Sequence, residues 1–105
     1  MSAWLILSTA GTEREGLRIA HKIVEERLAA CANVIRGVTS FFYWEGKLCQ
    51  EKEVVILIKT AEGKLEKLIN KIKEVHSYTV PEIIFLKVEG GEKKYLEWVK
   101  QVVKK

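Results

Sequence analysis

The sequence holds 105 residues, 48% of them hydrophobic, which suits a single folded domain over residues 1–105 and excludes intrinsic disorder. Its 18 basic and 14 acidic residues give a net charge of +4, but lysines and arginines are interspersed with glutamates, so no nucleic-acid-binding surface is expected. All the acidic residues are Glu, which removes the aspartates that EF-hand loops use. The apolar start is too short for a signal peptide or a membrane span, and we expect a cytoplasmic protein that does not bind membranes.

The chain opens with a strand and a helix. Trp4–Thr9 is a nearly continuous apolar run, which predicts a buried strand. Gly11 then leads into a segment in which Thr12 and Glu15 have the spacing of a capping box. Residues at helical spacing follow: Leu17, Ala20, Ile23, Val24, Arg27 and Leu28. This pattern predicts an amphipathic helix of about four turns.

A long β-hairpin is expected next. The segments Ala32–Trp44 and Leu48–Thr60 both show strand-like patterns, and Glu45-Gly46-Lys47 supplies a polar turn between them. Gly37 is expected at a bulge or bend in the first arm. In the second arm Val54–Ile58 is apolar at every position, which predicts a central strand covered on both faces.

Four consecutive aromatic residues, Phe41, Phe42, Tyr43 and Trp44, end the first arm of this hairpin. Successive side chains of a strand point to opposite faces, so these rings would cover both sides. Four consecutive aromatic residues are not typical of a strand that has one face in water. We therefore expect both faces to be covered, the second of them by another subunit.

The last third of the chain predicts a helix, a strand and a short helix. The first helix follows Gly63, stops before Pro81 and carries His76 at its C-terminal end. Its apolar stripe comprises Leu65, Leu68, Ile69, Ile72 and Val75. Residues Glu82–Val88 are predicted to form a strand, and the final helix carries Tyr95, Leu96, Trp98, Val99 and Val102. The order β-α-β-β-α-β defines an α+β, ferredoxin-like antiparallel sheet with two helices on one face and a short C-terminal helix.

Four segments of the sequence together resemble the CutA family, often labelled divalent-cation tolerance proteins: Arg27–Val34, Tyr43–Lys47, Leu57–Thr60 and His76–Ile83. They cover most of the chain in the family's order. The resemblance implies a ferredoxin-like subunit that forms a tight homotrimer, in which the sheets of three subunits extend one another. Such a trimer is architecturally similar to the PII signalling proteins.

Two positions depart from the family's pattern. Ser77 stands where proline is usual, which makes the turn after the second helix less rigid, although Pro81 still restricts Val80. Thr79 stands where an acidic residue is usual, which removes one candidate ligand from the segment around His76.

Candidate metal ligands are Cys31, His76, Glu45 and Glu82. The soft thiolate of Cys31 suits copper, the imidazole of His76 suits Cu(II) or Zn(II), and either glutamate would add a harder ligand. Copper or another divalent cation is thus the expected cofactor, with no organic cofactor. Two other readings stay open: Cys31 as a small buried core residue, and His76 as a cap that interacts with the helix dipole.

A further set of residues is expected at subunit boundaries or in a pocket between subunits: Tyr43, Trp44, Lys47, Lys59, Thr60 and Tyr78. The aromatic members suit an interface. Lys59 and Thr60, at a strand end, offer an anion site, whereas Glu45 and Lys47 also read as a solvated pair. Cys31 and Cys49 are expected to be free thiols.

No local signature of an enzyme is present, because the sequence shows neither a nucleophile with a base nor paired carboxylates. Three hypotheses remain. The protein is a trimer that binds copper or other divalent ions in the response to metal ions; or a PII-like sensor or adaptor that binds a small anionic metabolite or a partner protein between subunits; or a structural trimer without a specific small ligand.

Overall fold

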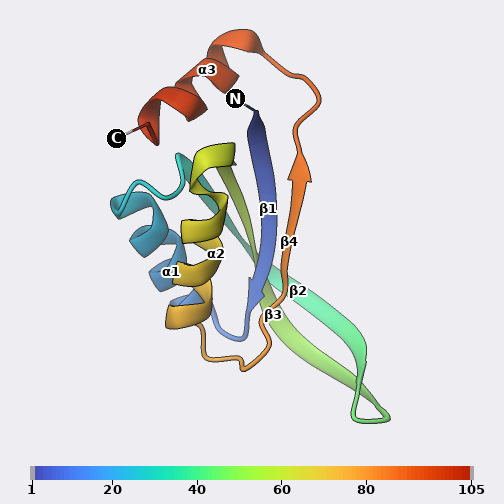
Figure 1. The fold of residues 1–105 in the computed structure, drawn as a ribbon. Helices are drawn as coiled ribbons and strands as arrows, with labels where there is room; N and C mark the ends of the chain where they lie inside the picture. Colours follow the sequence, from blue (N-terminus) through green and yellow to red (C-terminus); the bar gives the residue numbers. More distant parts are fainter. Residues whose placement is uncertain (1, 105) are drawn as a thin grey trace.

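The computed structural model describes residues 2–104, and the predicted α+β order holds within them. The elements are β1 (Ala3–Ala10), α1 (Glu13–Glu25), β2 (Cys31–Trp44), β3 (Lys47–Ala61), a 3₁₀ helix (Glu62–Lys64), α2 (Leu65–Val75), β4 (Ile83–Lys87) and α3 (Lys93–Val102). The antiparallel sheet has the strand order β2-β3-β1-β4. Helices α1 and α2 cover one face of the sheet, and α3 lies across one end (Figure 1).

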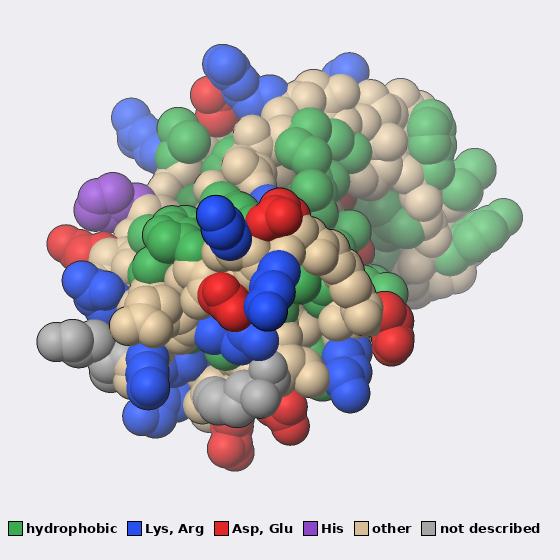
Figure 2. Space-filling model, turned by 90° about the horizontal axis from the view of Figure 1, so that it is seen from above, with side chains coloured by type: hydrophobic (Ala, Val, Ile, Leu, Met, Phe, Trp, Pro, Cys, Tyr) green, Lys and Arg blue, Asp and Glu red, His purple; other side chains and the backbone are tan. Residues whose placement is uncertain are grey.

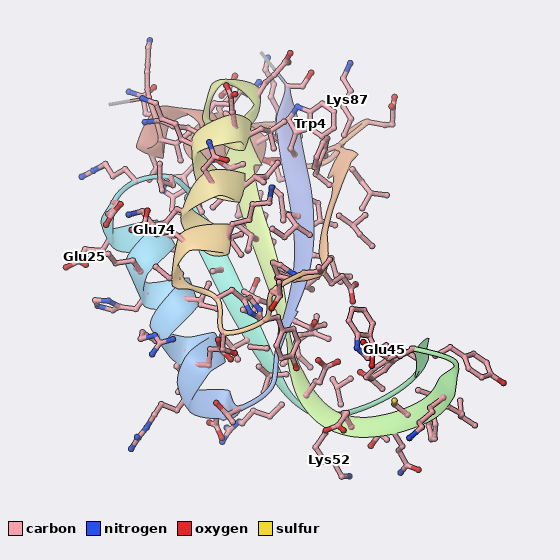
Figure 3. All side chains as sticks on the ribbon, turned by 60° about the horizontal axis from the view of Figure 1, so that its bottom comes forward. Trp4, Glu25, Glu45, Lys52, Glu74 and Lys87 are labelled. Carbon is pink, nitrogen blue, oxygen red and sulfur yellow. The ribbon has the colours of Figure 1, made fainter. Side chains whose placement is uncertain are left out.

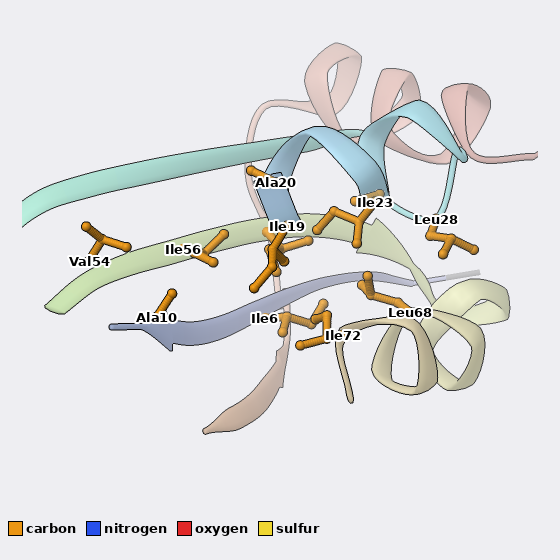
Figure 4. Packing of buried hydrophobic residues seen from close by; sticks show 12 residues of the cluster. Ile6, Ala10, Ile19, Ala20, Ile23, Leu28, Val54, Ile56, Leu68 and Ile72 are labelled. Atoms are coloured by element: carbon orange, nitrogen blue, oxygen red, sulfur yellow. The ribbon is translucent and has the colours of Figure 1, made fainter. Parts of the chain in front are cut away.

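The main core lies between the sheet and these two helices (Figure 4). Each strand contributes alternate residues to it, as the two-residue period of a strand requires. Its central members are Ile6, Ile56 and Ile58 from the sheet, Ile19 and Ile23 from α1, and Leu68 and Ile72 from α2. Burying each such side chain contributes about 1.5–3 kcal/mol, so this layer supplies most of the stability of the subunit.

Both ends of α1 are defined by specific hydrogen bonds. Thr12 Oγ1 accepts a hydrogen bond from the Glu15 N–H at 3.1 Å, which confirms the Thr12 half of the predicted capping box, whereas the Glu15 carboxylate turns to Ser77. At the other end the Leu28 N–H donates to the Ile23 carbonyl at 2.9 Å, and Arg27 adopts φ +58°. These are the bonds of a Schellman motif, which ends the helix before Leu28 although the apolar pattern continues to it.

The apolar stripe expected on α1 is partly wrong. Ala20 and Ile23 are buried as expected, but Leu17 and Val24 are exposed, and Gly16 and Ile19 take their place on the buried face. Gly16 explains the difference, because a Cβ at this position would lie 2.5 Å from Val54 Cγ2. The absence of a side chain there lets the helix approach β3 closely along that face.

The β2–β3 hairpin has the predicted turn and bulge. Glu45 and Gly46 have φ values of +51° and +78°, the pattern of a two-residue type I′ turn. The strand register shifts between Ile35 and Val38, where Gly37 has φ +75°. Beyond this bulge the hairpin extends away from the rest of the subunit (Figure 1).

The aromatic residues of the hairpin are not covered by their own chain. Tyr43 is 75% exposed, and Phe41 and Trp44 are more than half exposed. The expectation that one face of the strand end is covered within the subunit is therefore wrong, because the hairpin tip lies beyond β1 and β4. Any cover on either face has to come from another molecule.

The face of the sheet opposite the helices is apolar and uncovered. Its members alternate with the core residues: Leu5, Leu7, Ile35, Val55, Leu57, Ile84 and Leu86. We call this set the open face. Leu86 is 52% exposed, and the outer edges of β2 and β4 have no strand partner within the described chain. The sequence predicts that both faces of the strand around Val54–Ile58 are covered. Within one subunit, only the face toward the helices is.

Charged side chains of both signs are mixed at the α3 end of the molecule, whereas hydrophobic side chains gather away from it (Figure 2). This mixture agrees with the interspersed charges of the sequence. Among the helices described, none is long and apolar enough to cross a membrane.

Candidate functional site

His76 is the C-cap residue of α2, and its side chain is fully buried. Its Nε2 lies 2.6 Å from the Thr9 carbonyl oxygen, and its Nδ1 accepts a hydrogen bond from the Tyr78 N–H at 3.0 Å. A carbonyl oxygen only accepts and a backbone N–H only donates, so these contacts define a neutral ring with the proton on Nε2. Both ring nitrogens are therefore engaged within the subunit.

Glu15, from the first turn of α1, lies beside this histidine. Its Oε2 is 3.7 Å from His76 Nδ1 and accepts a hydrogen bond from the Ser77 N–H at 2.7 Å. Its Oε1 accepts from the Ser77 hydroxyl at 3.0 Å. Burial alone would raise the pKa of Glu15, but the hydrogen bonds from the Ser77 N–H, the Ser77 hydroxyl and the Gly11 backbone outweigh it and hold the pKa below its ordinary 4.5. The carboxylate is ionised at neutral pH.

Tyr78 ties the same loop to the hairpin. Its hydroxyl donates to Glu53 Oε2 at 2.7 Å, and its ring centroid is 4.7 Å from that of His76. Burial, followed by the hydrogen bond to Glu53 and by nearby carboxylates, raises the pKa of Tyr78 well above its ordinary 10.0. The phenol stays protonated, and the loop after α2 is anchored to α1, β1 and β3 at once.

Cys31 begins β2 and lies at the other end of the sheet. It is a half-buried free thiol outside the core cluster of the subunit, so the alternative of a small buried core residue does not hold within one subunit. Its Sγ is 4.0 Å from Lys59 Nζ and 3.8 Å from Asn33 Oδ1, and Lys59 also donates to Asn33. Tyr95 of α3 adjoins the same thiol. The Lys59 ammonium beside this thiol repels a metal cation.

The structure does not bring Cys31 and His76 together. Cys31 pairs with Lys59 opposite Leu5, whereas the Thr9 carbonyl that holds His76 lies four residues further along β1. At about 3.4 Å per residue, that separation is about 14 Å along the strand.

The two candidate glutamates lie elsewhere again. Glu45 is at the hairpin tip, away from α1 and α2 (Figure 3), and Glu82 is exposed just before β4. Across residues 2–104, no three His, Cys, Asp or Glu side chains form a group that could hold a metal ion. A site that used all four candidates would need more than one subunit.

The predicted boundary residues fall into two groups. Tyr43, Trp44 and Lys47 are exposed on the hairpin, where another molecule can reach them. Thr60 is buried and donates to the Leu28 carbonyl at 2.7 Å, whereas Lys59 lies on the opposite face of the same strand. These two neighbours therefore do not converge on one anion.

An open groove of about 1010 Å³ runs beside the free edge of β2. Its walls come from α1 (Leu17, Ala20, His21, Val24 and Glu25), from residues 30–34 and from Trp98. Sequence reasoning missed this groove because it assigned Leu17 and Val24 to the core. Leu17 and Val24 are seven residues apart, which places them on one side of the helix together with His21 and Glu25. This spacing could have indicated a second apolar stripe on α1.

Together, the split βαβ sheet, the uncovered apolar face and the long protruding hairpin define a ferredoxin-like α+β subunit. A family model described as "CutA1 divalent ion tolerance protein" matches residues 4–102. The chain belongs to the CutA family.

Individual relatives agree over nearly the whole chain. The "Divalent-cation tolerance protein CutA" of Thermus thermophilus is 39% identical over 97 residues, which cover 92% of this chain and 94% of that protein. A solved structure of the Thermus thermophilus protein has a TM-score of 0.92 at 38% identity, covering 94% of this chain and 96% of that one. The structure of CutA1 from Oryza sativa has a TM-score of 0.94 at 39% identity, covering 97% of this chain and 94% of that one.

The relatives differ in length and in stated compartment. The chain spans 54% of the "Protein CutA 1, chloroplastic" of Oryza sativa, to which it is 42% identical over 91% of its own length. A structure from Archaeoglobus fulgidus, with a TM-score of 0.92 and 37% identity over 96% of this chain and 98% of that one, is titled a periplasmic protein. The family is thus not restricted to one compartment, and the cytoplasm stays a prediction for this chain.

Proposed function

We propose that this chain acts as a homotrimer that binds divalent cations, copper among them, and takes part in the response to metal ions. The observation that carries the proposal is the family match over residues 4–102, because the matched relatives are named for tolerance of divalent cations. The same names describe tolerance proteins and not enzymes, in keeping with the expectation that this chain does not catalyse a reaction.

The open face supports the oligomeric part of the proposal. An isolated domain rarely leaves a contiguous apolar sheet face in water, and this one adjoins two strand edges that no strand among residues 2–104 pairs with. Another copy of the chain offers complementary edges of the same kind. Closed symmetry would cover all the open faces at once, together with the aromatic residues of the hairpin.

Cys31 and His76 remain the proposed first ligands, with Glu45 and Glu82 as carboxylates that neighbouring subunits would bring. The half-exposed thiol of Cys31 is open to a soft ion, although Lys59 must move for a cation to bind there. The PII-like sensor is not favoured, because the relatives reported above carry cation-tolerance names. The same names give the structural trimer without a ligand no support.

Copper titration of two single-cysteine variants tests the proposal. Cys31→Ala is expected to weaken copper binding without changing the oligomeric state. Cys49→Ala is the matched control, since Cys49 is also a free thiol on a strand but lies near the hairpin tip, where its Sγ donates to the Lys47 carbonyl. Equal affinity in both variants would remove Cys31 from the metal site. Absence of saturable copper or zinc binding in the unaltered protein would overturn the proposed function itself.

A further inference from the structure

We propose that Tyr78 fixes the direction in which the β2–β3 hairpin leaves the subunit, and that neighbouring copies need this direction in order to assemble. The inference rests on the proposed homotrimer and names a contact inside one subunit on which the trimer depends. The hydroxyl of Tyr78 binds Glu53 of its own chain, so Tyr78 acts as a positioning residue.

The outer part of the hairpin, residues 38–53, has no neighbouring strand within the described chain. β1 pairs with β3 as far as Ala10, which lies opposite Val54, and β2 pairs with β3 alone. Glu53 is thus the first residue of β3 beyond the end of β1. Most residues of the outer part are exposed, and the hairpin extends away from the subunit (Figure 1).

The bulge at the root of this part is only tied to the helices on its near side. Arg36, just before the bulge, pairs with Glu13 of α1 at 3.2 Å. Gly37 follows with φ +75°, and a Cβ added there would meet no described atom within 4 Å. A bulge bends its strand, but this one is not packed, so contacts beyond it decide how the outer part is held.

One side-chain bond makes that contact. Among the side-chain hydrogen bonds and ion pairs of residues 2–104, only that of Tyr78 with Glu53 joins the outer part of the hairpin to the rest of the subunit. The Tyr78 hydroxyl donates to Glu53 Oε2 at 2.7 Å, a short bond to a charged acceptor. The other side-chain bonds stay within the hairpin, between Lys52 and Thr39 and between Cys49 and Lys47.

Tyr78 itself is held firmly at its own end. Its N–H donates to His76 Nδ1 at 3.0 Å, and the two rings lie 4.7 Å apart. The preceding residue, Ser77, donates twice to Glu15 of α1. These contacts place the phenol independently of Glu53, so the hydrogen bond transmits the position of α1 and of the end of α2 to β3.

The path of the Tyr78 side chain requires Gly11, in the turn between β1 and α1. A Cβ at Gly11 would lie 3.1 Å from the Tyr78 hydroxyl oxygen and 3.6 Å from its Cε1. The phenol therefore passes directly over the backbone of this turn before it reaches Glu53. The sequence provides both the ring that crosses the turn and the missing side chain that lets it cross.

A small change of angle at the bulge becomes a large displacement at the hairpin tip. At about 3.4 Å per residue the tip lies about 24 Å beyond Val38, so a rotation of about 10° there moves the tip by about 4 Å. Tyr43 and Trp44 lie at the tip, are more than half exposed, and are expected to meet another copy. Interface cores are packed as closely as protein interiors, and a shift of this size would break such contacts.

Hydrogen–deuterium exchange and native mass spectrometry of Tyr78→Phe, which keeps the ring and removes the hydroxyl, test the proposal. The amides of residues 38–53 are expected to exchange about threefold to tenfold faster than in the unaltered protein, as the loss of one hydrogen bond implies, while those of β1 and α2 keep their rates. The trimer is expected to dissociate at a higher protein concentration. Tyr95→Phe is the matched control, because its hydroxyl adjoins Cys31 at the start of β2, and its hairpin should exchange normally.

Variants of Glu53 test the same bond from the other side. Glu53→Ala is expected to behave like Tyr78→Phe, and it repeats the test at a second position if Tyr78→Phe folds poorly. Glu53→Gln keeps an oxygen that accepts from the phenol and is expected to restore most of the protection. The double variant Tyr78→Phe with Glu53→Ala should be no worse than either single variant, because one bond is lost in all three. Additive effects would show that the two residues act separately, which would overturn the proposal.

The remaining outcomes separate this inference from the proposed function. Suppose that the unaltered protein is a trimer. Unchanged hairpin exchange in Tyr78→Phe, equally faster exchange throughout the subunit, or a loosened hairpin with unchanged dissociation would each reject the role of Tyr78 and leave the homotrimer intact. An unaltered protein that is a monomer would overturn the homotrimer and this inference with it.

Discussion

Ser77 donates two hydrogen bonds to the carboxylate of Glu15, from its backbone N–H at 2.7 Å and from its hydroxyl at 3.0 Å. The pair joins the loop after α2 to the first turn of α1. Proline, which the resemblance to the family makes the expected residue here, has neither donor. The departure at Ser77 therefore replaces the rigidity of a proline ring with a partly buried, charge-assisted link between the loop after α2 and helix α1.

Glu15→Gln is expected to reduce the free energy of unfolding and its dependence on pH. The pKa of Glu15 is lowered in the folded protein, so its stabilising effect is fully present above the ordinary value of 4.5 and is lost as the pH falls through the folded value. Losing hydrogen bonds to a charged group should cost about 1.5–3 kcal/mol at neutral pH. Urea unfolding from about pH 7 to about pH 3, at one protein concentration, measures both effects. Parallel pH curves for the variant and the unaltered protein would contradict this account.

Gly16→Ala is expected to destabilise the protein although alanine is the better helix former. The added Cβ would lie 2.5 Å from Val54 Cγ2, a buried and branched side chain with little freedom to move. Overpacking of this kind costs about 1–3 kcal/mol, against a gain in helix propensity of about 1 kcal/mol. Gly90→Ala is the control, because its Cβ meets no atom within 4 Å. Denaturant midpoints that rise for Gly16→Ala would show that α1 does not need this close approach.

Two variants of Arg27 together measure the cost of its left-handed backbone conformation. Its φ of +58° is costly for a residue with a side chain, and its Nη1 donates to the Val102 carbonyl at 3.1 Å. Arg27→Gly and Arg27→Ala both lose that hydrogen bond, but only glycine relieves the left-handed conformation. The glycine variant is expected to be more stable than the alanine variant by about 1 kcal/mol in thermal or urea unfolding. Equal stability would mean that the Schellman turn carries no strain.

Leu86→Glu is expected to weaken the proposed trimer without unfolding the subunit. Leu86 lies on the open face and is 52% exposed, so the charge remains in water in a monomer but would be buried in an oligomer. Lys67→Glu, at an exposed position of α2, is the control and should leave the oligomeric state unchanged. Light scattering after size-exclusion chromatography distinguishes the two. A Leu86→Glu protein of unchanged mass would place the open face outside the interface.

The fold was largely predictable because each element carries a strong local signal. The apolar run of Trp4–Thr9, the turn at Gly46 and the stripe of α2 each specify one structure, and the order of elements then leaves few topologies. The face of α1 was harder to predict. Apolar residues occur on two stripes of that helix, and only the space left by Gly16 beside Val54 decides which stripe is buried.

The surroundings of His76 depend on tertiary structure that no local pattern reveals. Thr12 and Glu15 have the spacing of a capping box, but the carboxylate turns to Ser77, which is 62 residues away in the sequence. Only the packing of α1 beside α2 brings these groups together. The position of His76 at the end of α2 followed from the sequence, whereas its partners Thr9, Glu15 and Tyr78 did not.

Native mass spectrometry of the metal-free protein, followed by stepwise addition of Cu(II), tests most directly the claim that this chain is a trimer that binds divalent cations. One series of spectra reports both the assembly and the number of ions bound. The account predicts a trimer that takes up copper in whole-number steps to a plateau. A monomer, or a trimer that ignores copper or accumulates it without a plateau, would contradict it.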